Sequence, residues 1–223
     1  MKLETYPDRE LMMIDLANTL AGDLKGCLLR HDHASFVVPG GTTPGPIFDN
    51  LCAAALDWSR VHVMLSDERW VPEDNPRSNT GLLRARLFQN RAAEARYVPL
   101  YAEAEAPEDA LSSLIADVER ELPISVLLLG MGADMHTASL FPGADNLTPA
   151  MDASAPALMA MRAPGAPEPR ITLTAPVLAG AMTTHVVITG DEKRAALDAA
   201  QSLTLEEAPI SVVLRNATVH WAP

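Results

Sequence analysis

The chain of 223 residues has few cysteines and no long apolar run. Its two cysteines, Cys27 and Cys52, form no CxxC pair, which is typical of reduced, half-buried thiols in a cytoplasmic protein. No apolar run is long enough to cross a bilayer, and the N-terminal MKLETYPDRE lacks the basic and apolar regions of a signal peptide. We therefore expect a cytoplasmic protein without a membrane partner.

Basic residues are also scarce, with 17 Lys and Arg against 29 Asp and Glu and a net charge of −12. A general nucleic-acid binder needs a basic face, so we expect no nucleic-acid partner. The GK[ST] of a P-loop, the GxGxxG of a dinucleotide fold, the GxSxG nucleophile elbow and the HExxH zinc motif are all missing. An anionic ligand would have to be held by a few locally concentrated cations.

What the chain does contain is an alternation of helical and strand-like apolar patterns, with no internal repeat and no linker. One α/β domain over residues 1–223 is expected. The predicted strands are 35–38, 61–65, 124–129, 158–161, 184–189 and 218–221, and the predicted helices are 8–30, 47–56, 78–88, 107–122 and 191–202. This order predicts a Rossmann-like three-layer α/β/α fold with a mostly parallel sheet, in which ligands bind beyond the carboxyl ends of the strands.

Two polar stretches follow the first two of these strands. PGGTTPG supplies Gly40, Gly41, Thr42 and Thr43, whose backbone amides and hydroxyls suit a phosphate group, although an ordinary strand-to-helix turn would look similar. In the polar loop SDERWVPEDNPRSN, Asp67 can orient a sugar hydroxyl while Arg69 holds an anion. A solvated surface loop is the alternative for this second stretch.

The stretch LLLGMGADMHTASLFPG, residues 127–143, follows the strand 124–129. Histidine is the side chain most often used as a general base, so His136 is the candidate base, and Asp134 can fix its tautomer. The alternative is a helix-capping turn with an incidental histidine. Further along, Arg170 precedes ITLT, and Lys193 lies in the first turn of a helix, where a cation is unfavourable unless it faces an anion.

The other histidines carry weaker signals. His31 and His33 form an HDH loop with no third metal ligand nearby in the sequence. The histidines at 62, 185 and 220 lie in strand-like runs and are interpreted as structural. No metal or cofactor is expected.

Taken together, these stretches resemble the 6-phosphogluconolactonase family of the sugar-phosphate isomerase/deaminase superfamily. The resemblance rests on motifs in the same order over residues 38–194: Gly40–Pro44, Asp67–Arg69 with a following VP and SN, Leu129–Gly143, Arg170–Leu178 and Gly190–Arg194. One position departs from the family pattern, because Met135 stands where a glycine is usual. A positive φ at that position would strain a methionine.

The resemblance implies hydrolysis of 6-phospho-D-glucono-1,5-lactone to 6-phosphogluconate in the pentose phosphate pathway, without a cofactor. It implies that His136 is the catalytic base. Because a nearby carboxylate can orient a histidine, we expect Asp134 to be its partner. Gly40–Thr43, Asp67, Arg69, Arg170 and Lys193 are then the predicted substrate-binding residues. The expected partner is the small sugar-phosphate lactone, and a monomer or weak homodimer is expected.

Two rival functions stay open from the sequence. A glucosamine-6-phosphate deaminase/isomerase shares the scaffold but usually has DEY in place of Asp67–Arg69, and it needs a further carboxylate near the histidine that the segment 136–143 lacks. A non-catalytic sugar-phosphate sensor usually carries an added DNA-binding domain, of which there is no sign here.

Overall fold

A computed structural model describes residues 1–223. It contains a seven-stranded sheet of order β1-β10-β9-β6-β2-β3-β5 in which every pair is parallel, and a separate three-stranded antiparallel sheet of order β4-β8-β7. The strands are β1 (Lys2–Thr5), β2 (Ala34–Val38), β3 (Val61–Leu65), β4 (Asp67–Arg69), β5 (Arg96–Tyr97), β6 (Val126–Gly130), β7 (Leu158–Met161), β8 (Arg170–Leu173), β9 (Thr183–Thr189) and β10 (Thr218–Ala222).

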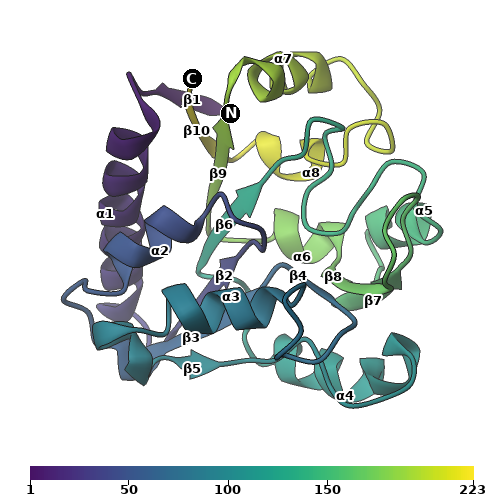
Figure 1. The fold of residues 1–223 in the computed structure, drawn as a ribbon, viewed down its shortest axis with the longest axis horizontal. Helices are drawn as coiled ribbons and strands as arrows, with labels where there is room; N and C mark the ends of the chain where they lie inside the picture. The colour runs from purple at the N-terminus through teal and green to yellow at the C-terminus, as the bar shows by residue number, and fades with distance from the viewer.

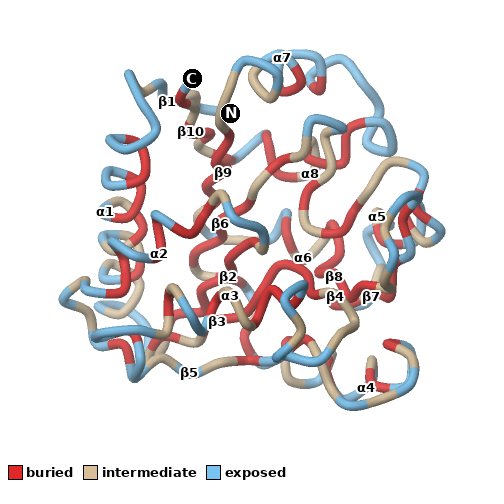
Figure 2. The backbone as a smooth tube through the Cα atoms, in the orientation of Figure 1, coloured by how far each residue is buried: buried red, intermediate tan, exposed pale blue.

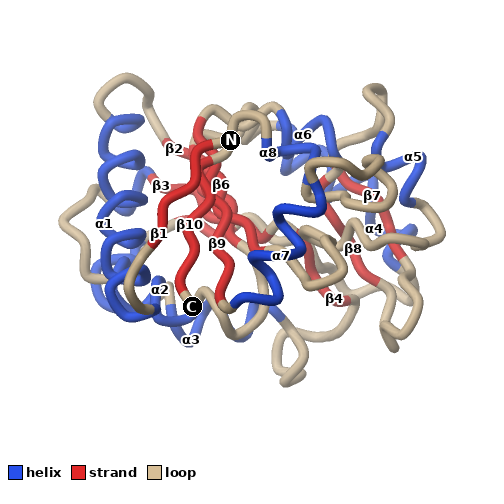
Figure 3. Tube along the Cα trace, turned by 90° about the horizontal axis from the view of Figure 1, so that it is seen from above, coloured by secondary structure: helices blue, strands red, loops and turns tan.

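The helices connect these strands as crossovers. They are α1 (Arg9–Leu28), α2 (Gly45–Leu51), α3 (Asn79–Arg86), α4 (Pro107–Glu119), α5 (Leu147–Met151), α6 (Ala175–Ala179), α7 (Asp191–Ala200) and α8 (Ser211–Leu214), with short 3₁₀ turns at Trp58–Arg60 and Asn90–Glu94. Helices α1 and α2 lie on one side of the large sheet, and α6, α7, α8 and the small sheet lie on the other (Figures 1 and 3). The predicted α/β fold with a mostly parallel sheet is confirmed.

The core lies between the central strands and the helices that cover them, where the backbone is buried (Figure 2). All five residues of β2 are buried, as expected of a strand with helices on both faces. Helix α1 starts where the side chain of Asp8 accepts a hydrogen bond from the amide of Leu11, and it buries a stripe of large apolar side chains: Met12, Met13, Leu16, Leu20 and Leu24. No helix combines the length and apolar character needed to cross a membrane.

Several elements differ from the sequence-based expectations. The stretch Asp67–Arg69 is a strand and not a loop, since it pairs antiparallel with Arg170–Leu173, itself a strand that the sequence did not indicate. Helix α2 ends at Leu51 and not at residue 56. The edge strand β1 has no predicted counterpart, because its short KLET sequence forms a strand only by pairing with β10.

A chain of polar groups runs across β9 and β10 to Tyr6, which follows the edge strand β1. The Nδ1 atom of His185 lies 3.0 Å from Nε2 of His220, whose Nδ1 lies 2.9 Å from the hydroxyl of Tyr6. Asp23 accepts from the other nitrogen of His185. Both histidines are buried, in keeping with the structural role predicted for them.

We expect this edge to make the protein less stable in acid. Burial, and then the neighbouring His185, lower the pKa of His220 from 6.5 to about 4. The unfolded chain therefore takes up a proton as the pH falls from about 6.5 to 4 while the folded chain does not, so the free energy of unfolding should fall by roughly 2–3 kcal/mol over that window.

Urea unfolding of wild type and His220→Gln across this pH window measures the effect. The substitution should flatten the pH dependence by that amount, whereas the exposed His31→Ala should not change it. Parallel curves for wild type and His220→Gln would contradict the assignment.

Candidate functional site

A cleft of about 200 Å³ opens at the carboxyl ends of β2, β6 and β9, next to β4 and β8. This is the sheet edge at which parallel α/β folds bind ligands. Its lining is mostly polar and comes from five separate stretches of sequence: Pro39, Gly40, Gly41, Thr43, Pro44, Asp67, Arg69, Asn79, Gly130, Met131, Gly132, His136, Ala138, Arg170, Val187 and Lys193.

The glycine–threonine loop forms one wall of the cleft. Gly41 has a φ of +80°, which a residue with a side chain rarely adopts. A Cβ atom on Gly40 would overlap the side chain of Asn79, whose amide donates to the backbone oxygen of Asp67 at 3.0 Å. The amides of Gly41, Thr42 and Thr43 donate to no carbonyl of the chain, so they are free to bind an anion.

His136 lies on the cleft wall and is held by three contacts. Its Nδ1 atom is 2.5 Å from Oδ1 of Asp134, and the same oxygen accepts from the backbone amide of His136 at 3.2 Å. The imidazole stacks on Phe141 with 4.1 Å between ring centroids. Because Asp134 accepts from Nδ1, Nε2 is the nitrogen left with a free lone pair, as a general base requires.

The backbone around His136 is tightly turned. Met135 has a φ of 66° and Ala138 a φ of 49°, both in the left-handed region that favours glycine. Met135 is held there by hydrogen bonds from its amide to Gly132 and from Ile210 to its carbonyl. The strain expected for a methionine at this position is therefore present, and surrounding contacts offset it.

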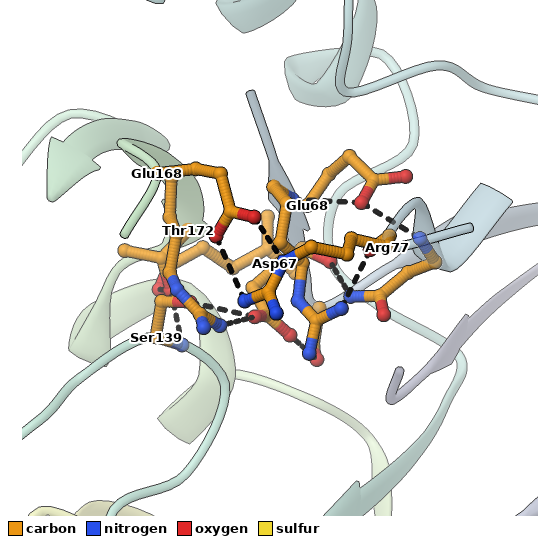
Figure 4. A network of polar contacts seen from close by, with 11 residues as sticks. Asp67, Glu68, Arg77, Ser139, Glu168 and Thr172 are labelled. Carbon is orange, nitrogen blue, oxygen red and sulfur yellow. Dashed lines mark hydrogen bonds and ion pairs between the residues drawn. The ribbon is translucent and has the colours of Figure 1, made fainter. Parts of the chain in front are cut away.

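A network of polar contacts surrounds Asp67, one of the residues that line the cleft (Figure 4). Asp67 is 5% exposed and accepts hydrogen bonds from Ser139 at 2.6 Å and from Ser66 at 3.1 Å. A guanidinium nitrogen of Arg170 lies 3.7 Å from the same carboxylate. These contacts fix the cation of Arg170 from behind, next to the Phe141 ring, which lies 5.1 Å from its central carbon.

The two arginines of the cleft each keep an unused donor. The Nε atoms of Arg69 and Arg170 are buried and contact no acceptor in the chain. Burial, only partly offset by the neighbouring Asp67 carboxylate, lowers the pKa of Arg170. Buried donors without partners are costly, so the arrangement is suited to an anion that would satisfy them.

Glu68 is a structural residue of the site that sequence reasoning missed. It is fully buried between Asp67 and Arg69, and its carboxylate accepts hydrogen bonds from the amides of Arg69, Asn79 and Thr80 and from the hydroxyls of Ser78 and Thr80. Ser78 is also the N-cap of α3. Glu68 thereby fixes α3, and with it Asn79, against β4.

Most predicted site residues meet in the cleft. Seven of them line it together with His136: Gly40, Gly41, Thr43, Asp67, Arg69, Arg170 and Lys193. Thr42 faces a neighbouring hollow beside α1, and Asp134 lies behind His136 without lining the cleft. Asn79 and Ser139 were not predicted as site residues. Asn79 lines the cleft, and both residues contact Asp67.

Gly132 offers a way to displace His136 without replacing it. A Cβ at Gly132 would overlap both the imidazole of His136 and the carboxylate of Asp134, whereas a Cβ at Gly130 meets no atom within 4 Å. If His136 is catalytic, Gly132→Ala should lower kcat by roughly 10–100-fold, because small displacements of reacting groups have effects of that size. Gly130→Ala, in the same cleft, is the matched control and should leave kcat nearly unchanged; equal rates for the two variants would contradict the prediction.

The chain that forms this cleft is similar to known proteins along almost its whole length. Residues 7–221 match the family model described as "Glucosamine-6-phosphate isomerases/6-phosphogluconolactonase". A 6-phosphogluconolactonase of Mesorhizobium japonicum is 43% identical over 98% of this chain and 94% of its own length. A 6-phosphogluconolactonase of Pseudomonas aeruginosa is also 43% identical, over 93% of this chain and 89% of its own.

The fold agrees with a solved structure from the same group. A crystal structure of a 6-phosphogluconolactonase from Shewanella baltica superposes with a TM-score of 0.96 at 29% sequence identity, covering 100% of this chain and 98% of the other. The similarity therefore extends over the sheet, the small antiparallel sheet and the cleft between them.

Proposed function

Since the chain belongs to the family of glucosamine-6-phosphate isomerases and 6-phosphogluconolactonases, we propose that its α/β fold, residues 1–223, is a lactonase that hydrolyses 6-phospho-D-glucono-1,5-lactone. The observation that carries the proposal is the position of the His136–Asp134 pair on the same cleft as the glycine–threonine loop and three cations. The cleft therefore offers a base at one place and anion-binding groups around it.

The phosphate group is the end of the substrate that this cleft can hold firmly. The free amides of Gly41 and Thr43, with the side chains of Arg69, Arg170 and Lys193, supply donors and positive charge. A phosphate there would accept hydrogen bonds from the unused Nε atoms of the two arginines. It would also offset the unfavourable interaction between Lys193 and the helix dipole in the first turn of α7. Binding at this end fixes the lactone carbonyl relative to His136.

Hydrolysis then needs a base and a route for one proton. Nε2 of His136 takes a proton from water as the water oxygen bonds to the lactone carbonyl carbon, and Asp134 stabilises the imidazolium that forms. When the tetrahedral intermediate collapses, the bond from the carbonyl carbon to the ring oxygen breaks. The imidazolium returns its proton to that oxygen, which leaves a hydroxyl and a carboxylic acid. The acid then releases its remaining proton to solvent and becomes the carboxylate.

The rival deaminase chemistry is less well supported by these residues. The segment from His136 to Gly143 has no glutamate that could move a second proton. The two relatives at 43% identity are named as lactonases. A sensor without turnover would have no need for the Asp134 carboxylate that orients His136.

The test is a coupled assay of 6-phosphogluconate formation from freshly prepared lactone, corrected for spontaneous hydrolysis, beside an assay of ammonia release from glucosamine 6-phosphate. Turnover of the lactone alone supports the proposal. Ammonia release without lactone turnover would identify a deaminase, and binding of 6-phosphogluconate with turnover of neither compound would identify a sensor.

Arg170→Met tests the assignment of the phosphate end. The loss of a charge-assisted hydrogen bond of about 1.5–3 kcal/mol should raise KM for the phosphorylated lactone by roughly 10–100-fold. KM for the unphosphorylated glucono-1,5-lactone should change little. A similar rise for both lactones would contradict a phosphate contact, and an exposed arginine, Arg120→Met, is the control for loss of charge.

A further inference from the structure

A second group of chemistry-bearing side chains lies at the opposite end of the large sheet from the cleft. His33 immediately precedes β2, His62 is the second residue of β3, and Glu121 follows the end of α4. One nitrogen of each imidazole and one carboxylate oxygen all lie within 4.8 Å of one another. The sequence shows no third ligand near His33, and the structure brings one from a distant part of the chain.

We propose that His33, His62 and Glu121 form a binding site for one divalent transition-metal ion of the zinc type. Two imidazoles and one carboxylate are a donor set that Zn²⁺ accepts, with a solvent molecule as fourth ligand. The same oxygen of Glu121 lies 2.8 Å from Nδ1 of His62 and 3.2 Å from Nε2 of His33. In a tetrahedral site with bonds of about 2.0–2.1 Å, neighbouring donor atoms lie about 3.3–3.4 Å apart, so small movements suffice for these two pairs.

The charge at this place also favours a cation. The side chain of Glu121 is only 5% exposed, and no lysine or arginine lies within ion-pair distance of it. A buried carboxylate without a permanent positive partner is unfavourable. The residues within ion-pair distance of this carboxylate are the two histidines, and a divalent ion bound between the three side chains would supply the missing positive charge.

The structure around the site holds His62 and Glu121 in place and leaves the His33 side chain able to move. Ser35 and Ser125 exchange hydrogen bonds at 3.1 and 3.0 Å, which fixes the segment after Glu121 against β2. The rings of His33 and His62 are stacked, with 4.4 Å between their centroids. One ion cannot lie in the planes of two stacked rings, so His33 has to turn about its side-chain bonds; its side chain is 41% exposed and free to do so.

The consequence would be a cross-link between two neighbouring strands and the end of α4. Strand β2, five residues and roughly 17 Å long, separates this site from the glycine–threonine loop. The ion would therefore stabilise the fold and would take no part in the proposed hydrolysis.

The test is thermal and urea unfolding of chelator-treated protein with Zn²⁺ added in increments, beside calorimetric titration. One ion should bind per chain, and at a free Zn²⁺ concentration about 100 times Kd the unfolding equilibrium constant should fall roughly 100-fold. His33→Ala and Glu121→Gln should lose this stabilisation. His31→Ala, which removes an exposed histidine two residues away, should keep it, and His33→Ala should retain wild-type lactone turnover.

If the buried Glu121→Gln variant does not fold, His33→Ala alone carries the test. The His33 side chain is the most exposed of the three, so its removal disturbs the fold least. Absence of any stabilisation of the wild type by Zn²⁺ would overturn the proposal. Equal stabilisation of wild type and His33→Ala would also overturn it, because the ion would then bind elsewhere.

Discussion

Replacing His136 by alanine is expected to lower kcat for the phosphorylated lactone by roughly 10²–10⁴-fold, the usual contribution of a general base. The expectation follows from the geometry around the ring. Asp134 engages Nδ1 at 2.5 Å, Phe141 stacks on one face, and Nε2 is left to take a proton from water. The proposed phosphate-binding groups lie on other elements, so the dissociation constant of 6-phosphogluconate should change by less than about threefold.

The measurement has to separate enzymatic from spontaneous opening of the lactone. Initial rates at several enzyme concentrations, extrapolated to zero enzyme, give the uncatalysed rate that is subtracted. His31→Ala controls for the loss of a histidine outside the cleft and should have the wild-type kcat. A kcat for His136→Ala equal to that of the wild type would exclude His136 as the base, whatever the structure around it.

The parts of the fold that sequence could predict are those with local signals. The buried aliphatic runs of β2, β3, β6 and β9, and the capped start of α3 at Ser78, are each visible within about ten residues. The polar stretches follow those strands, so their meeting at one sheet edge follows from parallel topology. This is why most predicted site residues line one cleft.

The features that could not be predicted depend on partners far away in the sequence. Asp67–Arg69 contains only charged residues, and it becomes a strand because Arg170–Leu173 pairs with it. Likewise, nothing near His33 in the sequence indicates Glu121. A buried carboxylate such as Glu68 cannot be told from a surface one by its neighbours in DER, because its five donors are supplied by the folded backbone and by α3.

Glu68→Gln is the second substitution with a large expected effect, a loss of at least about 4 kcal/mol in the free energy of unfolding. The carboxylate is fully buried and accepts from the amides of Arg69 at 2.7 Å, Asn79 at 2.9 Å and Thr80 at 2.8 Å, as well as from two hydroxyls. A glutamine would turn an NH₂ group towards some of these donors. Several donors would then stay unsatisfied at about 1–3 kcal/mol each, and the negative charge at the start of α3 would be lost.

Urea unfolding at neutral pH measures this loss, with Glu73→Gln as the matched control. Glu73 pairs with Arg84 at the surface, so the control should change stability by about 0.5 kcal/mol at most.

Thr80→Val removes one hydroxyl donor to Glu68 and should lower the free energy of unfolding by about 1–2 kcal/mol, so it can be measured even if Glu68→Gln does not fold. If Glu68→Gln proved no more damaging than Glu73→Gln, the carboxylate could not be what fixes α3 and Asn79 beside the cleft. Its position between Asp67 and Arg69 makes the opposite result the expected one, because both of those neighbours on the same strand line the cleft.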